Sequence, residues 1–471
     1  MEDLIEQSRD TFGSRESFER SRRHMLCCLV GFGRRTITGL VRTQNRQQQD
    51  WTADYRFYSH DRFDEQAVFD LVRRILEGHL EPKAPLVAAM DDSLLRKTGR
   101  KIQGVRYLRD PLSPPFNVNF VRGLRILKLS AALPDGAGAA RMVPVDFQHA
   151  LLPPKPSRKA SPEELEAYQQ ERAKRNINRL GLQRLQLLRQ QMDQGGDSAR
   201  GLIVSVDGRF TNGTLLEAVP ERTVLIGRLR KDAVLYALPD TQPQKGRKRK
   251  YGQQSPTPEQ LLKDQSVAWQ TVRAHACGQV HDFQVKRLGP VVMRMNAGAM
   301  PVQIMVIKPL GYRLKLGGKL LYRQPAFLVS TDPDLPLEVF LQDYLWRWDI
   351  EVNFRDEKTI LKVGQAQVRT ENSTQNAPAL AVASYSLLLL AATQAYGKSG
   401  VPERQLQPKW YKRGPEKRAT TNELINQLRI ELWSAALQPG YFSDFTTNTG
   451  QNQKSEKCAL NPAAAMFSSY C

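Results

Sequence analysis

The chain has 471 residues, with 69 Lys and Arg against 48 Asp and Glu, and so carries a formal net charge of +21. A hydrophobic share of 41% is enough for a sizeable core, so composition excludes a wholly disordered chain, and the length suggests about three domains. Five cysteines without a C-x-x-C pair exclude a disulfide scaffold and favour a reducing cytoplasm. The charge predicts a polyanionic partner, either nucleic acid or an acidic membrane face.

The stretch 372–397 contains no charged residue and is the one segment that resembles a membrane span. Its uninterrupted apolar part is only Leu387 to Ala392, and serines, a threonine and a glutamine interrupt the rest. This pattern favours a buried helix of a large fold over a membrane helix. We therefore expect no membrane contact.

Residues 1–80 are predicted to form a helical N-terminal DNA-binding region. Glu16 to Val30 is the first expected helix, Gly31-Phe32-Gly33 is a turn, and a second helix opens with Arg34, Arg35 and Thr36. Two helices about a glycine-containing turn are typical of a helix-turn-helix DNA reader. Any small helical bundle also has such turns, so this assignment stays open against a purely structural one.

Residues 81–240 alternate apolar, strand-like runs with one long helical segment. Strands are expected at 85–90, 123–133, 140–152 and 201–210, and a pair of strands at 223–238. Ser161 followed by Pro162 and two glutamates predicts a helix start, and that helix is expected to continue to about Met192.

Residues 241–332 are predicted to be a β-rich insertion that begins with a basic loop. Five of the six residues from Lys245 to Lys250 are basic, which suits phosphate contacts by Arg247, Lys248, Arg249 and Lys250. A flexible solvated loop is the alternative. Residues 333–370 are expected to hold one long helix, from about Pro336 to Val363, and 371–471 a helical C-terminal region with a loose tail.

Acidic residues stand where two apolar strands end. Asp91 and Asp92 follow the run 85–90, and Asp207 follows the run 201–206. Carboxylates at strand ends can bind hard cations such as Mg²⁺ or Mn²⁺, two of which can act on one phosphodiester. An aspartate that merely ends its strand in a turn is the alternative for each residue alone.

The expected helix 336–363 carries a polar stripe. Tyr344, Arg347, Glu351 and Lys358 are spaced three, four and seven apart, which places them on one side of an uninterrupted helix. A glutamate flanked by cationic groups can bind a metal ion and the phosphates beside it. A solvated face with internal ion pairs is the alternative.

This stripe resembles the Y-x2-R-x3-E-x6-K signature of bacterial insertion-sequence DDE transposases, in the branch usually called family four. Asp91-Asp92-Ser93 looks like the first acid of that family, Asp207-Gly-Arg-Phe like the second, and 246–252 like its basic loop. The resemblance covers roughly residues 85–365. A D-x-S/T pattern favours Asp91 as the first acid and leaves Asp92 as the alternative.

The resemblance implies an α/β fold with an RNase H-like mixed sheet, flanking helices and a β-rich insertion. It implies that Asp91, Asp207 and Glu351 bind two Mg²⁺ or Mn²⁺ ions, and that Tyr344, Arg347 and Lys358 contact DNA. The implied activity is hydrolysis at transposon ends followed by 3′-OH strand transfer into target DNA, by a homodimer bound to terminal inverted repeats. Such an enzyme would work at the nucleoid of a bacterial cytoplasm.

Two alternatives from other classes remain. A catalytically silent DNA-binding repressor or a domesticated remnant would retain the basic surface without cleavage. A stand-alone metal-dependent nuclease would cleave without strand transfer. The presence of all three acids argues against a decayed copy.

Overall fold

The computed structural model describes residues 1–110, 113–114, 116–196, 198–239, 249–294, 300–315, 317–401 and 418–433. The chain forms two compact units, which we describe separately. The helical unit comprises Met1–Val68, Arg355–Val368 and the described residues from Asn372 onward. The sheet unit comprises Phe69–Phe354 and Arg369–Glu371.

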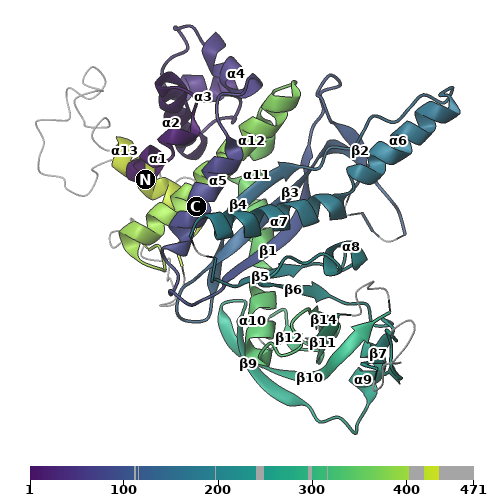
Figure 1. Cartoon of the computed structure of the whole chain (residues 1–471). Coiled ribbons are helices and arrows are strands. Elements are labelled where there is room, and N and C mark those ends of the chain that lie inside the picture. The colour runs from purple at the N-terminus through teal and green to yellow at the C-terminus, as the bar shows by residue number, and fades with distance from the viewer. Residues whose placement is uncertain are drawn as a thin grey trace, which may run out of the picture. The chain divides into compact units, whose positions relative to one another are not determined.

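The helical unit packs short N-terminal helices with two helices from the end of the chain (Figure 1). Buried aromatic rings fill its N-terminal part, with Phe57 stacked 5.2 Å from Phe63 between ring centroids. His24 is fully buried and is held at 2.8 Å by both Asp54 and the hydroxyl of Tyr58. The elements are α1 (Glu2–Glu6), η1 (Arg9–Thr11), α2 (Arg15–Val30), α3 (Ile37–Thr43), α4 (Thr52–Ser59), η2 (Val363–Gln365), α12 (Glu371–Tyr396) and α13 (Thr421–Trp433), with α5 (Glu65–Glu77) shared between the units.

Helix α12 contains the apolar stretch that resembled a membrane span. Among the described residues it is the one helix long and apolar enough to cross a membrane. The protein itself buries 83% of its most apolar window, as in the core helix of a folded domain. Burial of this kind agrees with the expected core helix.

The predicted helix, turn and helix at the N-terminus are present as α2, residues 31–36 and α3. Thr36 caps α3 by accepting a hydrogen bond from the backbone of Gly39 at 3.0 Å. Arg35, expected on the DNA-facing start of the second helix, is instead buried and donates to the carbonyls of Cys28 and Leu29. Its guanidinium therefore supports the turn, while Arg34 remains exposed.

The sheet unit is built on five strands in the order β4–β3–β1–β5–β6, flanked by helices. The first three strands are antiparallel neighbours, while β5 and β6 run parallel to β1. All five residues of β5 are buried, as expected of a strand between two neighbours and covered on both faces. The mixed sheet with flanking helices confirms the predicted RNase H-like α/β class. The bounds are β1 (Leu86–Arg96), β2 (Arg106–Arg109), β3 (Phe120–Pro134), β4 (Ala140–His149), β5 (Leu202–Val206) and β6 (Thr223–Arg228).

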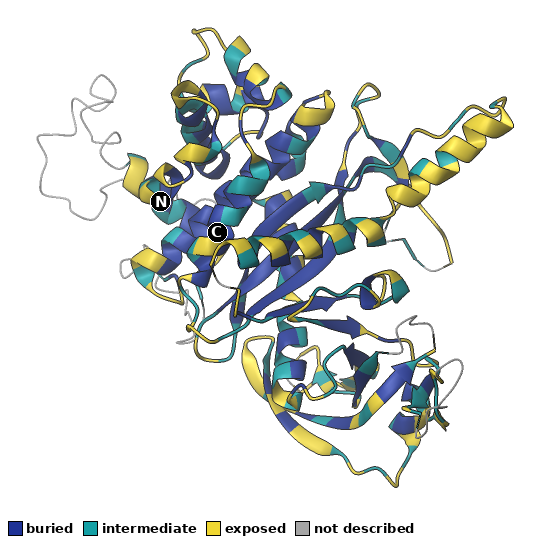
Figure 2. Cartoon of the chain, viewed as in Figure 1, coloured by how far each residue is buried: buried dark blue, intermediate teal, exposed yellow. Residues whose placement is uncertain are grey.

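The helix expected from Ser161 to Met192 is two helices, α6 (Pro162–Lys174) and α7 (Ile177–Gln194). A capping box between Ser161 and Glu164 opens α6, as predicted. Asn176 then caps a new helix, because its side chain accepts a hydrogen bond from the backbone of Asn178. The prediction of one continuous helix was therefore wrong. Figure 2 shows α6 as almost entirely exposed, and none of its residues is buried.

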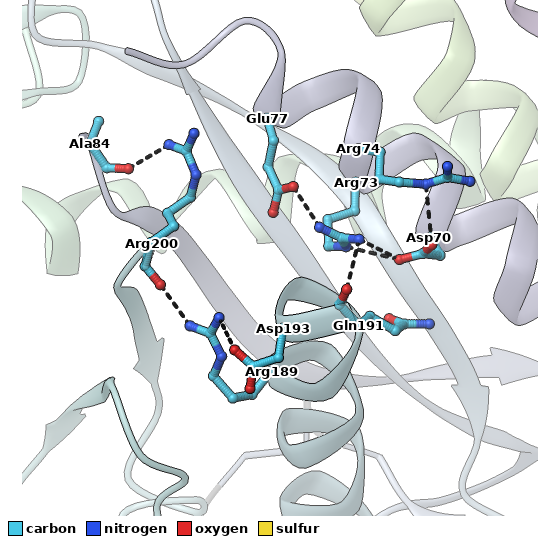
Figure 3. Close-up of polar contacts among 9 residues, drawn as sticks. All are labelled: Asp70, Arg73, Arg74, Glu77, Ala84, Arg189, Gln191, Asp193 and Arg200. Carbon is cyan, nitrogen blue, oxygen red and sulfur yellow. Dashed lines mark hydrogen bonds and ion pairs between the residues drawn. The ribbon is translucent and has the colours of Figure 1, made fainter. Parts of the chain in front are cut away.

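Two ion pairs within α5 hold the buried Arg73, and a hydrogen bond from Arg73 links the C-terminal part of α5 to α7 (Figure 3). The side chain of Arg73 is 1% exposed and lies between Asp70 and Glu77 on its own helix. It also donates to the backbone carbonyl of Gln191 at 3.2 Å. Because burying a charge is costly unless it is paired and hydrogen-bonded, this arrangement fixes α5 against α7.

The β-rich insertion continues the same sheet beyond β6. Strand β14 pairs antiparallel with β6, and β11, β10 and β7 extend the order outward. Its own core includes Leu235, Ile304 and Val329, so the insertion begins at the end of β6, before the expected residue 241. The short helix α8 (Gly213–Leu216) precedes β6 and lies outside the insertion. The elements of the insertion are β7 (Leu235–Ala237), β8 (Gln254–Ser255), α9 (Pro258–Lys263), β9 (Gln270–Ala276), β10 (Gln279–Met293), β11 (Pro301–Ile307), β12 (Gly311–Arg313), β13 (Leu320–Tyr322) and β14 (Ala326–Ser330).

Candidate active site

Strand pairing brings two of the predicted acids together. Strands β1 and β5 are parallel and in register from Leu86 opposite Leu202 to Met90 opposite Val206. The next residue on each strand is an aspartate, Asp91 and Asp207. The sheet therefore sets these two carboxylates side by side at one edge of a rigid, buried pair of strands.

A turn after β5 orients Asp207. Its Oδ1 accepts hydrogen bonds from the backbone amides of Arg209 at 2.9 Å and Phe210 at 3.3 Å. This Asx-type turn fixes the carboxylate, and within the described residues its second oxygen has no backbone donor.

Adjacent residues of a strand point to opposite faces, and this separates Asp91 from Asp92. Asp91 lies opposite Lys128 of β3, and its Oδ2 accepts a hydrogen bond from the guanidinium of Arg347 at 3.2 Å. Asp92 faces away and pairs with Arg209 at 2.9 Å and with Arg125 at 3.3 Å. This geometry favours Asp91 as the first acid and gives Asp92 a role in holding the turn after β5.

The single helix predicted for 336–363 is wrong. The structure has α10 (Leu337–Trp346) and α11 (Asp349–Thr359), separated at Arg347 and Trp348. Through this break the backbone makes i to i+3 hydrogen bonds, from Arg347 to Tyr344 and from Glu351 to Trp348. These tighter turns interrupt the i to i+4 ladder between Tyr344 and Glu351.

The four signature residues are distributed over the end of α10, the break and α11. Tyr344 lies in the last turn of α10, and the guanidinium of Arg347, at the helix end, lies 5.6 Å from the centre of its ring. Glu351 lies in the first turn of α11, exposed, at the end of the helix where the backbone dipole favours a negative charge. Lys358 lies exposed in the last turn of α11, in the part of that helix assigned to the helical unit.

The three acids influence one another electrostatically. The pKa of Asp91 is raised to about 7, first by burial and then by the negative charges of Asp207 and Glu351, while Arg347 opposes the shift. A cation bound beside these carboxyls would relieve the repulsion among them. Electrostatic influence at Asp91 thus links the three predicted acids, which are spread over 260 positions of the chain.

The donor set fits a hard divalent cation, because all three candidate ligands are carboxylates. Among the described residues, however, no three His, Cys, Asp or Glu side chains are gathered closely enough to enclose an ion. In this conformation Arg347 holds one oxygen of Asp91. A bound cation would therefore compete with that guanidinium for the carboxylate.

Several basic residues near the acids were not predicted from the sequence, among them Lys128 and Arg209. Lys128 is fully buried, stands directly across from Asp91 in the pairing of β3 with β1, and its ammonium lies 4.0 Å from the centre of the Phe354 ring. Arg209 follows Asp207 by two residues and contacts Asp92. Arg209 could have been predicted near the acids, because it follows Asp207 by two residues in the chain. Lys128 could not, because only the register of β3 with β1 places it beside Asp91.

The predicted basic loop is described only in part. Arg249 and Lys250 lie exposed before β8, and Arg247 and Lys248 lie outside the described residues. Their contacts with DNA, like those of Tyr344 and Lys358, remain predictions.

Comparison with known proteins adds one finding. A profile of the family described as DDE superfamily endonuclease matches residues 15–281, more than half of the chain. The matched segment runs from α2 into β10 and includes Asp91 and Asp207, while Glu351 lies beyond it. No curated protein matches the chain.

Proposed function

The chain belongs to the DDE superfamily endonuclease family, and from this premise we propose that it is the DNA transposase of an insertion sequence. In this proposal it hydrolyses phosphodiester bonds at the transposon ends and joins the resulting 3′-OH to target DNA. The observation that supports it best is the register of β1 with β5, which puts Asp91 beside Asp207 on rigid strands.

Asp91, Asp207 and Glu351 would hold two Mg²⁺ or Mn²⁺ ions. Such ions activate a nucleophilic oxygen and neutralise the charge that develops on the phosphate. The residues of the chain supply position: backbone amides hold Asp207, and β1 holds Asp91. Arg347 donates to Asp91 in the free protein and can turn to a phosphate oxygen when the substrate arrives.

Double-stranded DNA, as terminal inverted repeats and as target, is the proposed partner. Tyr344, Arg347 and Lys358 would contact phosphates near the cleaved bond, and the loop with Arg249 and Lys250 would add contacts farther away. Because two ends must be joined in one event, we propose a homodimer in the DNA complex. The proposed place of action is the nucleoid of a bacterial cytoplasm.

The test uses purified full-length protein, Mg²⁺ and DNA that carries the inverted repeats flanking the gene. The expected result is nicking at the 3′ ends of the repeats, followed by transfer of those ends into plasmid DNA. Glu351→Gln should abolish nicking and retain DNA binding. Specific binding without any cleavage by the natural protein would identify a repressor or remnant, and cleavage without joining would identify a nuclease.

A further inference from the structure

A strongly basic segment lies outside the assigned residues, apart from Arg125, the partner of Asp92. Between residues 96 and 125 the sequence has eight Lys or Arg and a single acid, Asp110. In the structure this segment contains the end of β1, the edge strand β2 and the first part of β3. A local excess of this size on an exposed edge is typical of a nucleic-acid contact.

Pairing of β2 with β3 puts two aromatic and two basic side chains on one face. Tyr107 lies opposite Arg122, and Arg109 lies opposite Phe120. Directly paired residues and residues two apart along a strand share a face, so aromatic and guanidinium groups alternate across and along the hairpin. We call these four residues the hairpin face.

Most of the hairpin face is open to solvent. Tyr107 is 72% exposed and Phe120 is 64% exposed, whereas Leu108 on the opposite face is 8% exposed. Arg122 donates to the carbonyls of Thr98 and Arg100 and so braces the hairpin. Within the described part of the chain, Arg109 makes no side-chain hydrogen bond or ion pair and can accept an anionic partner.

The register also relates the hairpin face to Asp91. Lys128, Arg122 and Phe120 are separated by even numbers of residues along β3, so they lie on the same side of the strand. Lys128 is the partner of Asp91. At ~3.3 Å per residue, the hairpin face begins about 20 Å from that pair and ends at about 26 Å, on the side of the sheet to which Asp91 points.

We propose that the hairpin face binds an unpaired segment of a DNA strand, with Tyr107 and Phe120 stacking on bases and Arg109 binding the phosphate between them. Exposed rings need base faces to stack on, and a duplex hides those faces within its own stack. The surrounding positive charge favours DNA over an apolar protein partner. The choice of DNA rests on the proposed function, but the binding requires neither the acids nor a metal.

The first experiment measures fluorescence anisotropy of the full-length protein with labelled dT30, without divalent metal. A matched 30-residue strand of abasic sites keeps the phosphates and removes the bases. The double variant Tyr107→Ala/Phe120→Ala should weaken dT30 binding about tenfold or more, and should bind the abasic strand as the natural protein does. Tyr107→Phe should retain the affinity, because the ring is kept.

Arg109→Ala tests the phosphate contact. The salt dependence of dT30 affinity should become shallower by about 0.7 in a log–log plot, the expected loss of one contact to a single strand. Lys263→Ala is the matched control, since Lys263 is a 72% exposed cation on α9 in the insertion and should leave the slope unchanged. Circular dichroism and thermal melting check that the variants fold.

Three results would overturn the inference. The double variant could bind dT30 as tightly as the natural protein does. Its affinity could also fall by the same factor for dT30, for the abasic strand and for a 30-base-pair duplex. The variant could also change the oligomeric state in light scattering while its DNA affinity stays intact, which would assign the hairpin face to a protein contact. A protein that fails to cleave but shows the predicted dT30 pattern would refute the proposed function alone.

Discussion

The two faces of strand β1 carry neighbouring aspartates in opposite settings. Asp91 points to the side with Asp207, Glu351 and a single arginine, Arg347, and its pKa is raised to about 7. Asp92 points to the other side and is paired with two arginines, Arg125 and Arg209. One pleat of the strand thus separates an acid with an excess of negative neighbours from an acid with an excess of positive ones.

This difference shows that the two faces of β1 have opposite balances of acidic and basic neighbours. On the Asp92 face the arginines match the carboxylate, so this group stabilises the turn after β5. On the Asp91 face three acids outnumber the basic neighbours Arg347 and Lys128, and this excess of negative charge costs stability in the free protein and would favour a bound cation. The predictions below test that difference.

The largest expected effect comes from neutralising one aspartate at a time. Asp91→Asn should lower the rate of single-turnover nicking by about 1000-fold or more, because it removes a proposed metal ligand. Asp92→Asn should lower the rate by less than about tenfold, since it changes only the support of the site. Equal losses in the two variants, both folded by circular dichroism, would contradict the assignment.

The next largest difference in nicking rate is expected between variants of Arg347 and Arg209. Arg347→Ala should reduce nicking about 10- to 100-fold through lost phosphate binding, with partial recovery in Arg347→Lys. Arg209→Ala removes a partly exposed ion pair and should change the free energy of unfolding by less than about 1 kcal/mol, with little effect on nicking. The measurements are nicking rates and urea unfolding, and a catalytic loss greater in Arg209→Ala than in Arg347→Ala would reverse the comparison.

Asp343 of α10 shows how burial alone changes the pKa of a carboxyl group in the sheet unit. Its pKa is raised to about 7 by burial, and among the described residues its Oδ2 has no hydrogen-bond partner. Its folded pKa lies above the unfolded value, so the native state binds more protons between about pH 4 and 7, and stability is lost as pH rises through this window.

The resulting prediction compares natural protein with Asp343→Asn. Between pH 5 and pH 8 the natural protein should lose stability on the order of 2 kcal/mol more than the variant, measured by urea unfolding without metal. Parallel curves for the two proteins would show that Asp343 does not titrate in this range.

The smallest expected effect is thermal stabilisation by Mg²⁺. A cation that binds only the native site should raise the melting temperature by a few degrees at saturating concentration. Asp92→Asn should retain this rise and Asp91→Asn should lose it. A rise that persists in Asp91→Asn would place the cation elsewhere.

Much of the sheet and two of the acids could be predicted from the sequence. Short apolar runs that lead into Asp91 and Asp207 are a local signal, and the structure has both strands. Strand β5 ends before Asp207 as predicted, whereas the predicted strand end at Asp91 is wrong, because pairing with β3 carries β1 on to Arg96. Which of Asp91 and Asp92 faces the site could not be settled that way, because a strand exposes both of its faces and only pairing and burial distinguish them.

The break between α10 and α11 had no local signal. The segment from Tyr344 to Asp349 contains neither proline nor glycine, and its spacing suits a continuous helix. The contact of Arg347 with Asp91 joins residues 256 positions apart, so it depends on tertiary structure. The hairpin face was missed for the same reason, since β2 is short and its partners appear only in the folded sheet.

The insertion between β6 and α10 has a consequence during protein synthesis. Residue 351 follows residue 207 by 144 positions, which a ribosome covers in roughly 7 to 29 seconds at 5–20 residues per second. Throughout that interval a nascent chain holds two of the proposed acids and lacks the third. A prematurely terminated chain would be equally incomplete, so under the proposed function the gene order of the three acids would withhold DNA cleavage until the insertion has been translated.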